Sequence, residues 1–405
     1  MRTYRDLFGR SGFTPLFLVS SGQVAGQTVS GLALGTLVYA DTGSPLLSGL
    51  AMFGPALAQV VGAATLLSAA DRLPPRAALS GLALAAALGA AFLAVPGLPV
   101  WGMLAVVLAL GALSALGGGV RYGLLNELLD RDGYLLGRSV LNMSSGIVQI
   151  AGFGAGGVLV TVLSPRGTLL VAAALHLAAA TAGLGLGRRR PRASGRPSPA
   201  ETWRDNARLW SDRPRRHVFL ALWLPNGLIV GCESLFVPLA PDRAGLLFAC
   251  AAGGMLAGDV LVGRYVPPHR RARLVTPLYL RLALPYLVFV ACPSPVLVAL
   301  ASAGFAATLL LQERLMALTP PELSGHALGL HSSGMIAMQG LAAALAGALA
   351  EHTSPGAAMA VLAAASAAVT LALAPRLRSP RVATPAQGPA KLPLTRGNRR
   401  GKDTS

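Results

Sequence analysis

Apolar runs of membrane-spanning length follow one another along almost the whole of this 405-residue chain. A helix that crosses a bilayer needs roughly 20 mostly apolar residues. Loops and open strand edges leave backbone groups unsatisfied in lipid, so each run is expected to be a helix. Charges, Pro and Gly delimit twelve runs: 14–40, 45–70, 77–96, 99–121, 139–163, 167–187, 217–239, 244–264, 273–292, 295–317, 326–350 and 355–375. The sequence therefore predicts an all-α membrane protein with twelve transmembrane helices.

Charged residues are too few to cover a water-soluble globule of this size. They make up 12% of the chain against 53% hydrophobic residues, about half of what a soluble domain carries. The net charge of +18 would indicate nucleic-acid binding only if the basic residues gathered on one face of a soluble domain. They lie between the apolar runs instead, so we expect a lipid bilayer and no nucleic acid as the partner.

The orientation follows from the distribution of Arg and Lys, which are retained on the cytoplasmic side. With the N-terminus inside, the loops outside the membrane hold only Arg166 and Arg243. An even number of spans then places both termini in the cytoplasm, and we expect the plasma membrane as the location. No cleavable signal peptide is expected, because residues 1–13 are polar and the first apolar run can span.

Residues 188–216 divide the runs into two groups of six. We expect an N-terminal six-helix bundle at 1–187, a cytoplasmic linker at 188–216 and a C-terminal six-helix bundle at 217–378. Residues 379–405 are rich in Pro and Arg without a periodic apolar face, which predicts a disordered basic tail.

Within the linker, a stretch rich in Pro, Ser and Arg is typical of a flexible segment. Trp203, Ala207 and Trp210 follow it at i, i+4 and i+7. This spacing predicts a short helix in the membrane interface, with its Trp side chains at headgroup depth. The alternative is an unstructured linker with incidental Trp residues.

Polar segments recur between the two groups. GRSVLNMSSG at 137–146 is matched loosely by GHALGLHSSG at 325–334, and the loops at 71–76 and 263–270 both carry Arg and a Pro-Pro pair. Glu127 likewise has a counterpart in Glu313. Paired halves of this kind are typical of secondary transporters, which bind substrate between the repeats.

With these features the chain resembles the major facilitator superfamily, and within it the twelve-span drug and metabolite exporters, over about 12–375. The family's loop 2–3 signature is matched by Asp71, Arg72 and Arg76, while Leu67 and Pro74 stand where Gly is usual. The resemblance implies two pseudo-symmetric bundles that work by alternating access, and we expect a monomer.

In the family, the loop aspartate meets an arginine at the end of span 4 and the positive N-terminus of span 11, which locks one conformational state. Asp71 and Arg121 occupy these places here. The alternative is that Asp71 and Arg72 are solvated loop charges.

The antiporter signature of span 5 reads Gly152-Phe153-Gly154-Ala155-Gly156-Gly157, without the usual Pro. Gly340 lies at the related place in span 11. Small residues at such spacing let helices approach closely, so helix packing alone also explains both stretches. Without the Pro, the kink that the signature implies is in doubt.

Charged side chains inside a span are costly and usually face a cavity or a partner. At 1.5 Å per residue, Asp259 lies about 7 Å, Arg281 about 12 Å and Glu233 roughly 24 Å from the cytoplasmic helix ends. Glu233 is therefore the candidate for proton coupling, since a carboxyl group in a half-dry cavity can load and release a proton as access alternates. Alternatively, it lies in the outer vestibule and hydrogen-bonds a neighbour. Asp259 with Arg281 or Arg264 is expected to be a structural pair near the inner gate.

The substrate candidates come from the spans that line the family's cavity. Gln23 and Gln27 share a face of span 1, and span 7 is expected to break at Pro225-Asn226-Gly227, where freed backbone groups can meet a ligand. Together with Trp223, Phe236 and Phe305, these groups suit a large, weakly polar organic molecule. Alternatively, Gln23 and Gln27 join helices by hydrogen bonds.

Other chemistries lack their motifs. His176, His326 and His331 are too scattered for a metal site, and no phosphate loop of the GxxxxGK[ST] type occurs. Cys232, Cys250 and Cys292 lie in apolar runs, where cysteine usually acts as a small apolar residue. We therefore expect no enzyme, no cofactor and no disulfide.

The sequence thus predicts a proton-coupled exporter of small organic molecules, an antiporter of the multidrug-resistance type. The alternatives are an importer or facilitator of a metabolite or lipid, and a membrane sensor or scaffold that does not transport.

Overall fold

The computed structural model describes residues 4–70, 73–129, 131–187, 199–289, 294–320 and 323–378. In these ranges every regular element is a helix. Asp71, Arg72, the linker stretch 188–198 and the predicted tail 379–405 lie outside the described residues.

The first group of helices covers the first six predicted spans. The last helix of the group contains two spans, because its backbone is broken at Ser164 (φ 72°, ψ 163°), directly before Pro165. A residue that precedes proline is disfavoured in the α conformation, so the chain turns there. The group consists of α1 (Tyr4–Phe8), α2 (Phe13–Thr42), α3 (Pro45–Ala70), α4 (Pro75–Leu93), α5 (Val100–Leu128) and α6 (Arg131–Leu184).

The second group covers the other six spans and follows the linker helix α7 (Pro199–Ser211). The tenth span is a composite of two α-helices joined by a 3-10 turn. The group consists of α8 (Arg213–Glu233), α9 (Phe236–Leu239), η1 (Pro241–Arg243), α10 (Ala244–Tyr265), α11 (Pro268–Phe289), α12 (Pro295–Ser302), η2 (Ala303–Ala306), α13 (Ala307–Ala317), α14 (Ser324–His352) and α15 (Pro355–Arg378).

One expectation for the second group is wrong. Span 7 does not break at Pro225: α8 runs through it, and the Pro225 carbonyl accepts a hydrogen bond from Ser366 Oγ at 3.1 Å. In the linker, Trp210 of α7 stacks on Trp223 of α8, and the expected headgroup depth of this helix stays a prediction. The side chain of Trp203 lies outside the described residues.

Proline and glycine set several helix boundaries. Many of the helices begin at a proline, whose missing N–H costs nothing in the first turn. Between α2 and α3, Gly43 adopts φ 65° and donates its N–H to the Tyr39 carbonyl, which ends α2 and lets the chain reverse within two residues. Asp212 caps α8 by accepting the Arg215 N–H at 3.2 Å.

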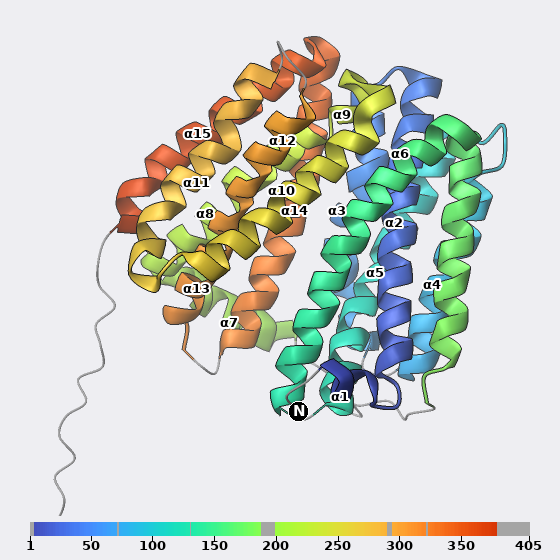
Figure 1. Cartoon of the computed structure of the whole chain (residues 1–405), viewed down its shortest axis with the longest axis horizontal. Helices are drawn as coiled ribbons and strands as arrows, with labels where there is room; N and C mark the ends of the chain where they lie inside the picture. The colour runs from blue at the N-terminus through green and yellow to red at the C-terminus, as the bar shows by residue number, and fades with distance from the viewer. Residues whose placement is uncertain are drawn as a thin grey trace, which may run out of the picture.

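The two groups form two helical bundles that stand side by side (Figure 1). Helices α2–α6 pack on one another in the first bundle and α8–α15 in the second. Two helix pairs make most of the contact between the bundles: α3 with α14, and α6 with α10. The apolar core of the second bundle extends to Leu32 of α2, and the first bundle has further apolar clusters of its own.

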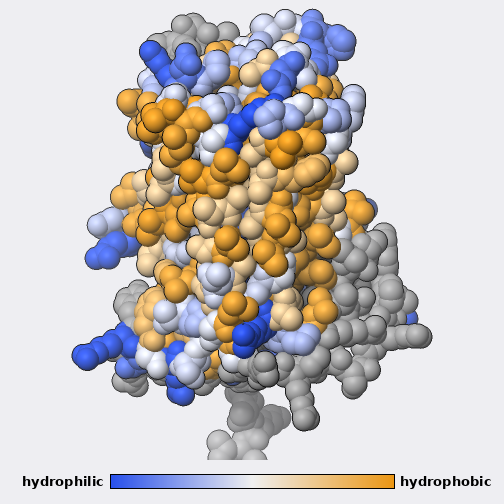
Figure 2. Space-filling view, turned by 90° about the vertical axis from the view of Figure 1, so that its right-hand side faces the viewer, coloured by the Kyte–Doolittle hydropathy of each residue, from blue (hydrophilic) through white to orange (hydrophobic). Residues whose placement is uncertain are grey.

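The surface carries an apolar belt between two polar ends (Figure 2). Within the described ranges, nine segments are long and apolar enough to cross a membrane, and the longest, Leu136–Leu184, contains the break at Ser164. Helices α2 and α11 are not among the nine, but their 30 and 22 residues pack within the bundles alongside the others. Together the helices make twelve passes through the two bundles.

The bundles meet mainly at one end of the molecule. We call the end with α1 and α7 the α7 end and the opposite end the α9 end; the bundles diverge toward the α7 end (Figure 1). The face of α14 that contacts α3 begins at Gly340, past the middle of the helix, and continues through Ala343 and Gly347. Glu351 then accepts a hydrogen bond from Ser44 of the first bundle. The contacts that hold the two bundles together therefore lie mainly at the α9 end.

Candidate functional site

Glu233 is buried at the last residue of α8, in the core of the second bundle. Tyr286 of α11, which is also buried, donates its hydroxyl to Glu233 Oε1 at 3.2 Å. The neighbouring Cys232 is turned toward α15, where its thiol donates to the Met359 carbonyl at 3.4 Å. Glu233 thus lies close to the α9 end, with a phenol as its hydrogen-bond partner.

A chain of aromatic rings leads from Glu233 to the first bundle. Tyr286 stacks on Phe236 with ring centroids 6.4 Å apart, and Phe236 meets Phe248 of α10 edge-on at 5.0 Å. Phe248 in turn stacks on Phe153 of α6 at 4.8 Å. Phe236, predicted for the substrate cavity, is therefore part of a connection between the buried carboxyl group and the bundle interface.

Five uncharged polar side chains form a second group, which we call the α8–α14 cluster. Gln312 Nε2 lies 2.9 Å from His331 Nε2, and Trp223 Nε1 donates to the His331 carbonyl at 3.1 Å. Gln339 Nε2 donates to Asn226 Oδ1 at 3.2 Å. Three helices, α8, α13 and α14, thus present amides, an imidazole and an indole together.

The other predicted substrate residues are not joined to this cluster by a hydrogen bond. Gln23 is half-buried and Gln27 exposed on α2, and neither amide has a hydrogen-bond partner among the described residues. The expected helix-joining alternative is thus not realised within that part of the chain. Phe305 lies in the 3-10 turn η2 and is buried in the core of the second bundle.

The glycines of the span 5 signature face two helices. A Cβ on Gly152 would lie 3.1 Å from Thr28 of α2, and one on Gly156 would lie 3.5 Å from Leu32. Gly157 instead faces the second bundle, where a Cβ would come within 2.9 Å of Gly245 Cα. Gly340 lets α14 pack closely on α3, since a Cβ added there would lie 2.8 Å from Leu57 Cδ2.

The charges predicted to form the gate are only partly described. Asp71 and Arg72 lie outside the described residues, so their predicted contact with Arg121 does too; Arg121 and Arg76 are half-buried on α5 and α4. Asp259 is exposed and forms no ion pair with described residues, and Arg281 donates its Nε to the Leu300 carbonyl at 3.0 Å. The expected pairing of Asp259 with Arg281 or Arg264 is therefore wrong.

A different ion pair lies at the corresponding end of the second bundle. Arg271 of α11 pairs with Glu313 of α13 and also donates its Nε to the Val266 carbonyl at 3.0 Å. This arginine ties the loop between α10 and α11 to the end of the tenth span. In the second bundle, the repeated loop at 263–270 and the repeated Glu313 thus lie at one ion pair, that of Arg271 with Glu313.

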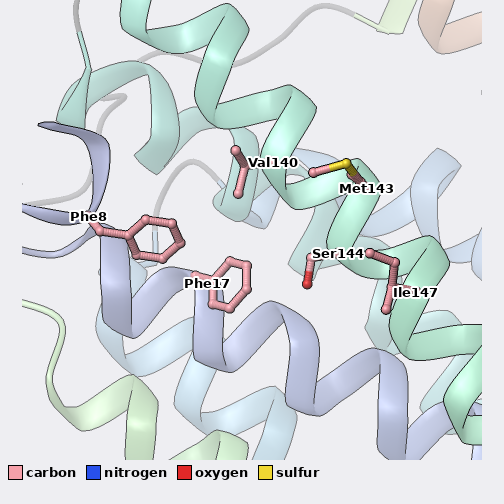
Figure 3. A pocket seen from close by; sticks show the side chains of 6 residues that line it. All are labelled: Phe8, Phe17, Val140, Met143, Ser144 and Ile147. Atoms are coloured by element: carbon pink, nitrogen blue, oxygen red, sulfur yellow. The ribbon is translucent and has the colours of Figure 1, made fainter. Parts of the chain in front are cut away.

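An open groove of about 420 Å³ lies between α1, α2 and α6 and is lined by Phe8, Phe17, Val140, Met143, Ser144 and Ile147 (Figure 3). Met143 and Ile147 share an exposed face of α6 with Ala151 and Val158. These four residues are separated by one or two helical turns, so the face is continuous along the helix. The groove is almost wholly apolar and contains none of the predicted site residues.

Paired six-helix bundles, an apolar belt and buried polar groups near the bundle interface define the class of multi-pass membrane transporters. The family model of the Major Facilitator Superfamily matches residues 16–311. The chain belongs to the major facilitator superfamily. None of the curated proteins matches it.

Solved structures of several transporters share this fold. A POT family transporter in complex with a thioalcohol-conjugated peptide is 12% identical with a TM-score of 0.71, covering 91% of this chain and 97% of its own. A mutant of the nucleoside transporter NupG is 13% identical with a TM-score of 0.71, covering 90% and 99%. A bacterial homologue of the human lysosomal transporter Spinster, inward-facing and unoccupied, is 14% identical with a TM-score of 0.65, covering 93% and 95%. At these identities the likeness concerns the fold.

Several residues of the site are not singled out by the sequence patterns. His331 enters the sequence interpretation as part of the repeat at 325–334 and as a rejected metal ligand, and Gln312, Gln339 and Tyr286 do not enter it, although each is a polar group inside an apolar run. That signal could have selected them as candidates. Their partners could not be predicted, because the contacts depend on how each helix is rotated in the bundle.

Within the described residues, Cys232 and Cys250 are free, and no group of His, Cys, Asp and Glu could hold a metal.

Proposed function

We propose that this transporter exports small organic molecules across the plasma membrane in exchange for protons, by rocking residues 1–187 against 217–378. The observation that carries the proposal is the buried Glu233, hydrogen-bonded to Tyr286 and connected by a series of aromatic contacts to the bundle interface.

The coupling step follows from burial and the position of the rings. Charging a carboxyl group in an apolar core costs several kcal/mol unless water or a partner compensates. When α6 and α10 separate at the α9 end, Phe153 leaves Phe248, and water gains a route past Phe236 to Glu233. When they close again, the route is removed. In the state open at the α9 end, Glu233 therefore takes up a proton from the outside, and exchange for substrate requires that it releases this proton to the cytoplasm in the other state.

The α8–α14 cluster is the proposed substrate site. Its amides, imidazole and indole offer hydrogen bonds without a fixed charge, and the stacked ring of Trp223 gives the cluster an aromatic wall. A buried polar site disfavours a ligand that leaves these groups unpaired. This chemistry suits a neutral or weakly polar organic molecule with an aromatic part, and it does not favour a strongly anionic one.

The direction of transport is inferred from the arrangement of the bundles. With the α7 end in the cytoplasm, as the positive-inside rule indicates, the structure corresponds to a state closed on the outside. The closed contacts at Gly157 and Gly340 and the hydrogen bond of Glu351 with Ser44 support this assignment. Such a state exchanges substrate with the cytoplasm, as an exporter does when it binds its cargo. The expected monomer and the direction of transport remain parts of the proposal, and the flux experiment tests the direction.

Radiolabelled chloramphenicol, a neutral nitroaromatic amide with two hydroxyl groups, is a suitable probe. In inside-out membrane vesicles with an acidic lumen, the wild-type protein is expected to accumulate the label, and a protonophore is expected to abolish the accumulation. Loss of preloaded label driven by the same gradient would indicate an importer. Equilibration regardless of the gradient would indicate a facilitator, and binding without movement would indicate a sensor or scaffold.

A further inference from the structure

The linker helix α7 is fixed to the second bundle by aromatic stacking. Trp210 lies nearly parallel to Trp223 of α8, with an interplanar angle of 13° and ring centroids 5.6 Å apart. Phe219 completes the group, 5.2 Å from Trp223 and 6.1 Å from Trp210. Leu209, the neighbour of Trp210, is fully buried in the same core. The end of α7 is therefore part of the packed structure of the second bundle.

Trp223 connects this stack to the α8–α14 cluster. Its indole Nε1 donates to the His331 carbonyl, and a Cβ on Gly334 would come within 2.9 Å of its Cδ2 atom. The backbone of α14 thus rests directly against the indole. The ring of His331 lies in turn 2.9 Å from Gln312. A displacement of the Trp223 ring must therefore move His331 or leave the indole N–H unpaired.

We propose that Trp210 is a positioning residue for the substrate site: by stacking on Trp223 it holds the indole against α14 and thereby sets the place of His331 and Gln312. The inference rests on the proposed role of the α8–α14 cluster. It adds that α7, a helix of the linker and not of a membrane span, determines how tightly that cluster binds substrate.

The chain has four tryptophans, which makes the contact directly observable. In a background carrying Trp101→Phe and Trp203→Phe, two variants are compared: Trp210→Phe, which keeps a ring at the stack, and Trp210→Ala, which removes it. Trp223 is then the sole tryptophan. Trp210→Ala is expected to shift its emission to longer wavelength and to increase quenching by acrylamide, whereas Trp210→Phe keeps the emission shielded. Identical emission and quenching in the two variants would overturn the proposal without any reference to transport.

Chloramphenicol flux in proteoliposomes supplies the second readout. Trp210→Ala is expected to raise the half-saturating concentration about threefold to tenfold with little change in maximal rate, because pre-organisation of the site is lost. Trp210→Phe is expected to restore it, and Trp101→Ala, at a strongly exposed tryptophan, serves as the matched control. Wild-type kinetics in Trp210→Ala would contradict the proposal. A wild-type protein that moves no chloramphenicol would contradict the proposed function instead, and the fluorescence comparison would still decide the role of Trp210.

Discussion

At the scale of single residues, Glu233 combines burial with one hydrogen bond from a neutral donor. Its partner Tyr286 is held by the packing of α11 and by the ring of Phe236. A carboxylate that accepts one hydrogen bond from the described residues of an apolar core is poorly compensated, which is the reason for proposing it as the coupling group. This property distinguishes it from Asp259, which is exposed on α10.

Tyr286→Phe tests the hydrogen bond while keeping the ring. A hydrogen bond to a charged group contributes about 1.5–3 kcal/mol, so proton-driven flux is expected to fall about tenfold. Exchange of labelled for unlabelled chloramphenicol, which needs no net proton movement, should persist. Tyr279→Phe is the matched control, since it removes a hydroxyl from another buried tyrosine of the same helix α11. Equal losses in both variants would show that Glu233 does not depend on Tyr286.

At the scale of helices, α6 and α10 approach each other through glycine. Gly157 and Gly245 let the two backbones touch, and the Phe153–Phe248 stack lies directly beside them. The same helix α6 packs on α2 through Gly152 and Gly156. One element thus carries both the internal packing of the first bundle and its contact with the second.

Gly157→Leu is expected to force α6 and α10 apart at the α9 end. Overpacking a close contact costs about 1–3 kcal/mol, enough to shift a balance between two conformations. Spin labels at Thr42→Cys and Thr353→Cys, two exposed positions on opposite bundles, should report a longer distance in this variant. Gly146→Leu, on the same helix with nothing within 4 Å of its Cβ position, should leave the distance unchanged. An unchanged distance in Gly157→Leu would contradict the role of this contact.

The helices themselves were predictable from the sequence, whereas their contacts were not. The span predicted at 45–70 coincides with α3, and the short helix expected in the linker is α7. Length and hydropathy decide whether a segment spans, and both can be read locally. Which face of α14 meets α8 depends on helix rotation, and runs that are apolar all round carry little signal for it. For this reason Glu233 could be selected by its charge and Tyr286 and Gln312 by their polarity, while their contacts and the Trp210 stack required the structure.

At the scale of the whole molecule, the two bundles are closed at the α9 end and diverge toward the α7 end (Figure 1). The closed end is secured by α3 against α14, by the hydrogen bond between Ser44 and Glu351, and by Tyr39, which donates to the Pro238 carbonyl at 3.4 Å. Alternating access requires that these contacts separate in each cycle.

A disulfide between Ser44→Cys and Glu351→Cys is expected to lock the α9 end and to abolish chloramphenicol flux, with recovery on reduction. The matched control links Asp41→Cys and Arg166→Cys, replacing a 3.7 Å ion pair within the first bundle. That link should leave transport intact, because rocking moves the bundle as a unit. Full flux through the oxidised Ser44–Glu351 pair would exclude separation of the bundles at this end.

Proton movement through Glu233 is the central claim, and it can be measured in proteoliposomes that contain a pH-sensitive dye and are preloaded with chloramphenicol. Diluting wild-type vesicles should acidify the lumen as the drug leaves, and Asp242→Asn, at an exposed carboxylate, should behave in the same way. Glu233→Gln, which keeps the size of the side chain and removes its charge, should exchange chloramphenicol without moving protons. Acidification by Glu233→Gln at the wild-type rate would contradict the account.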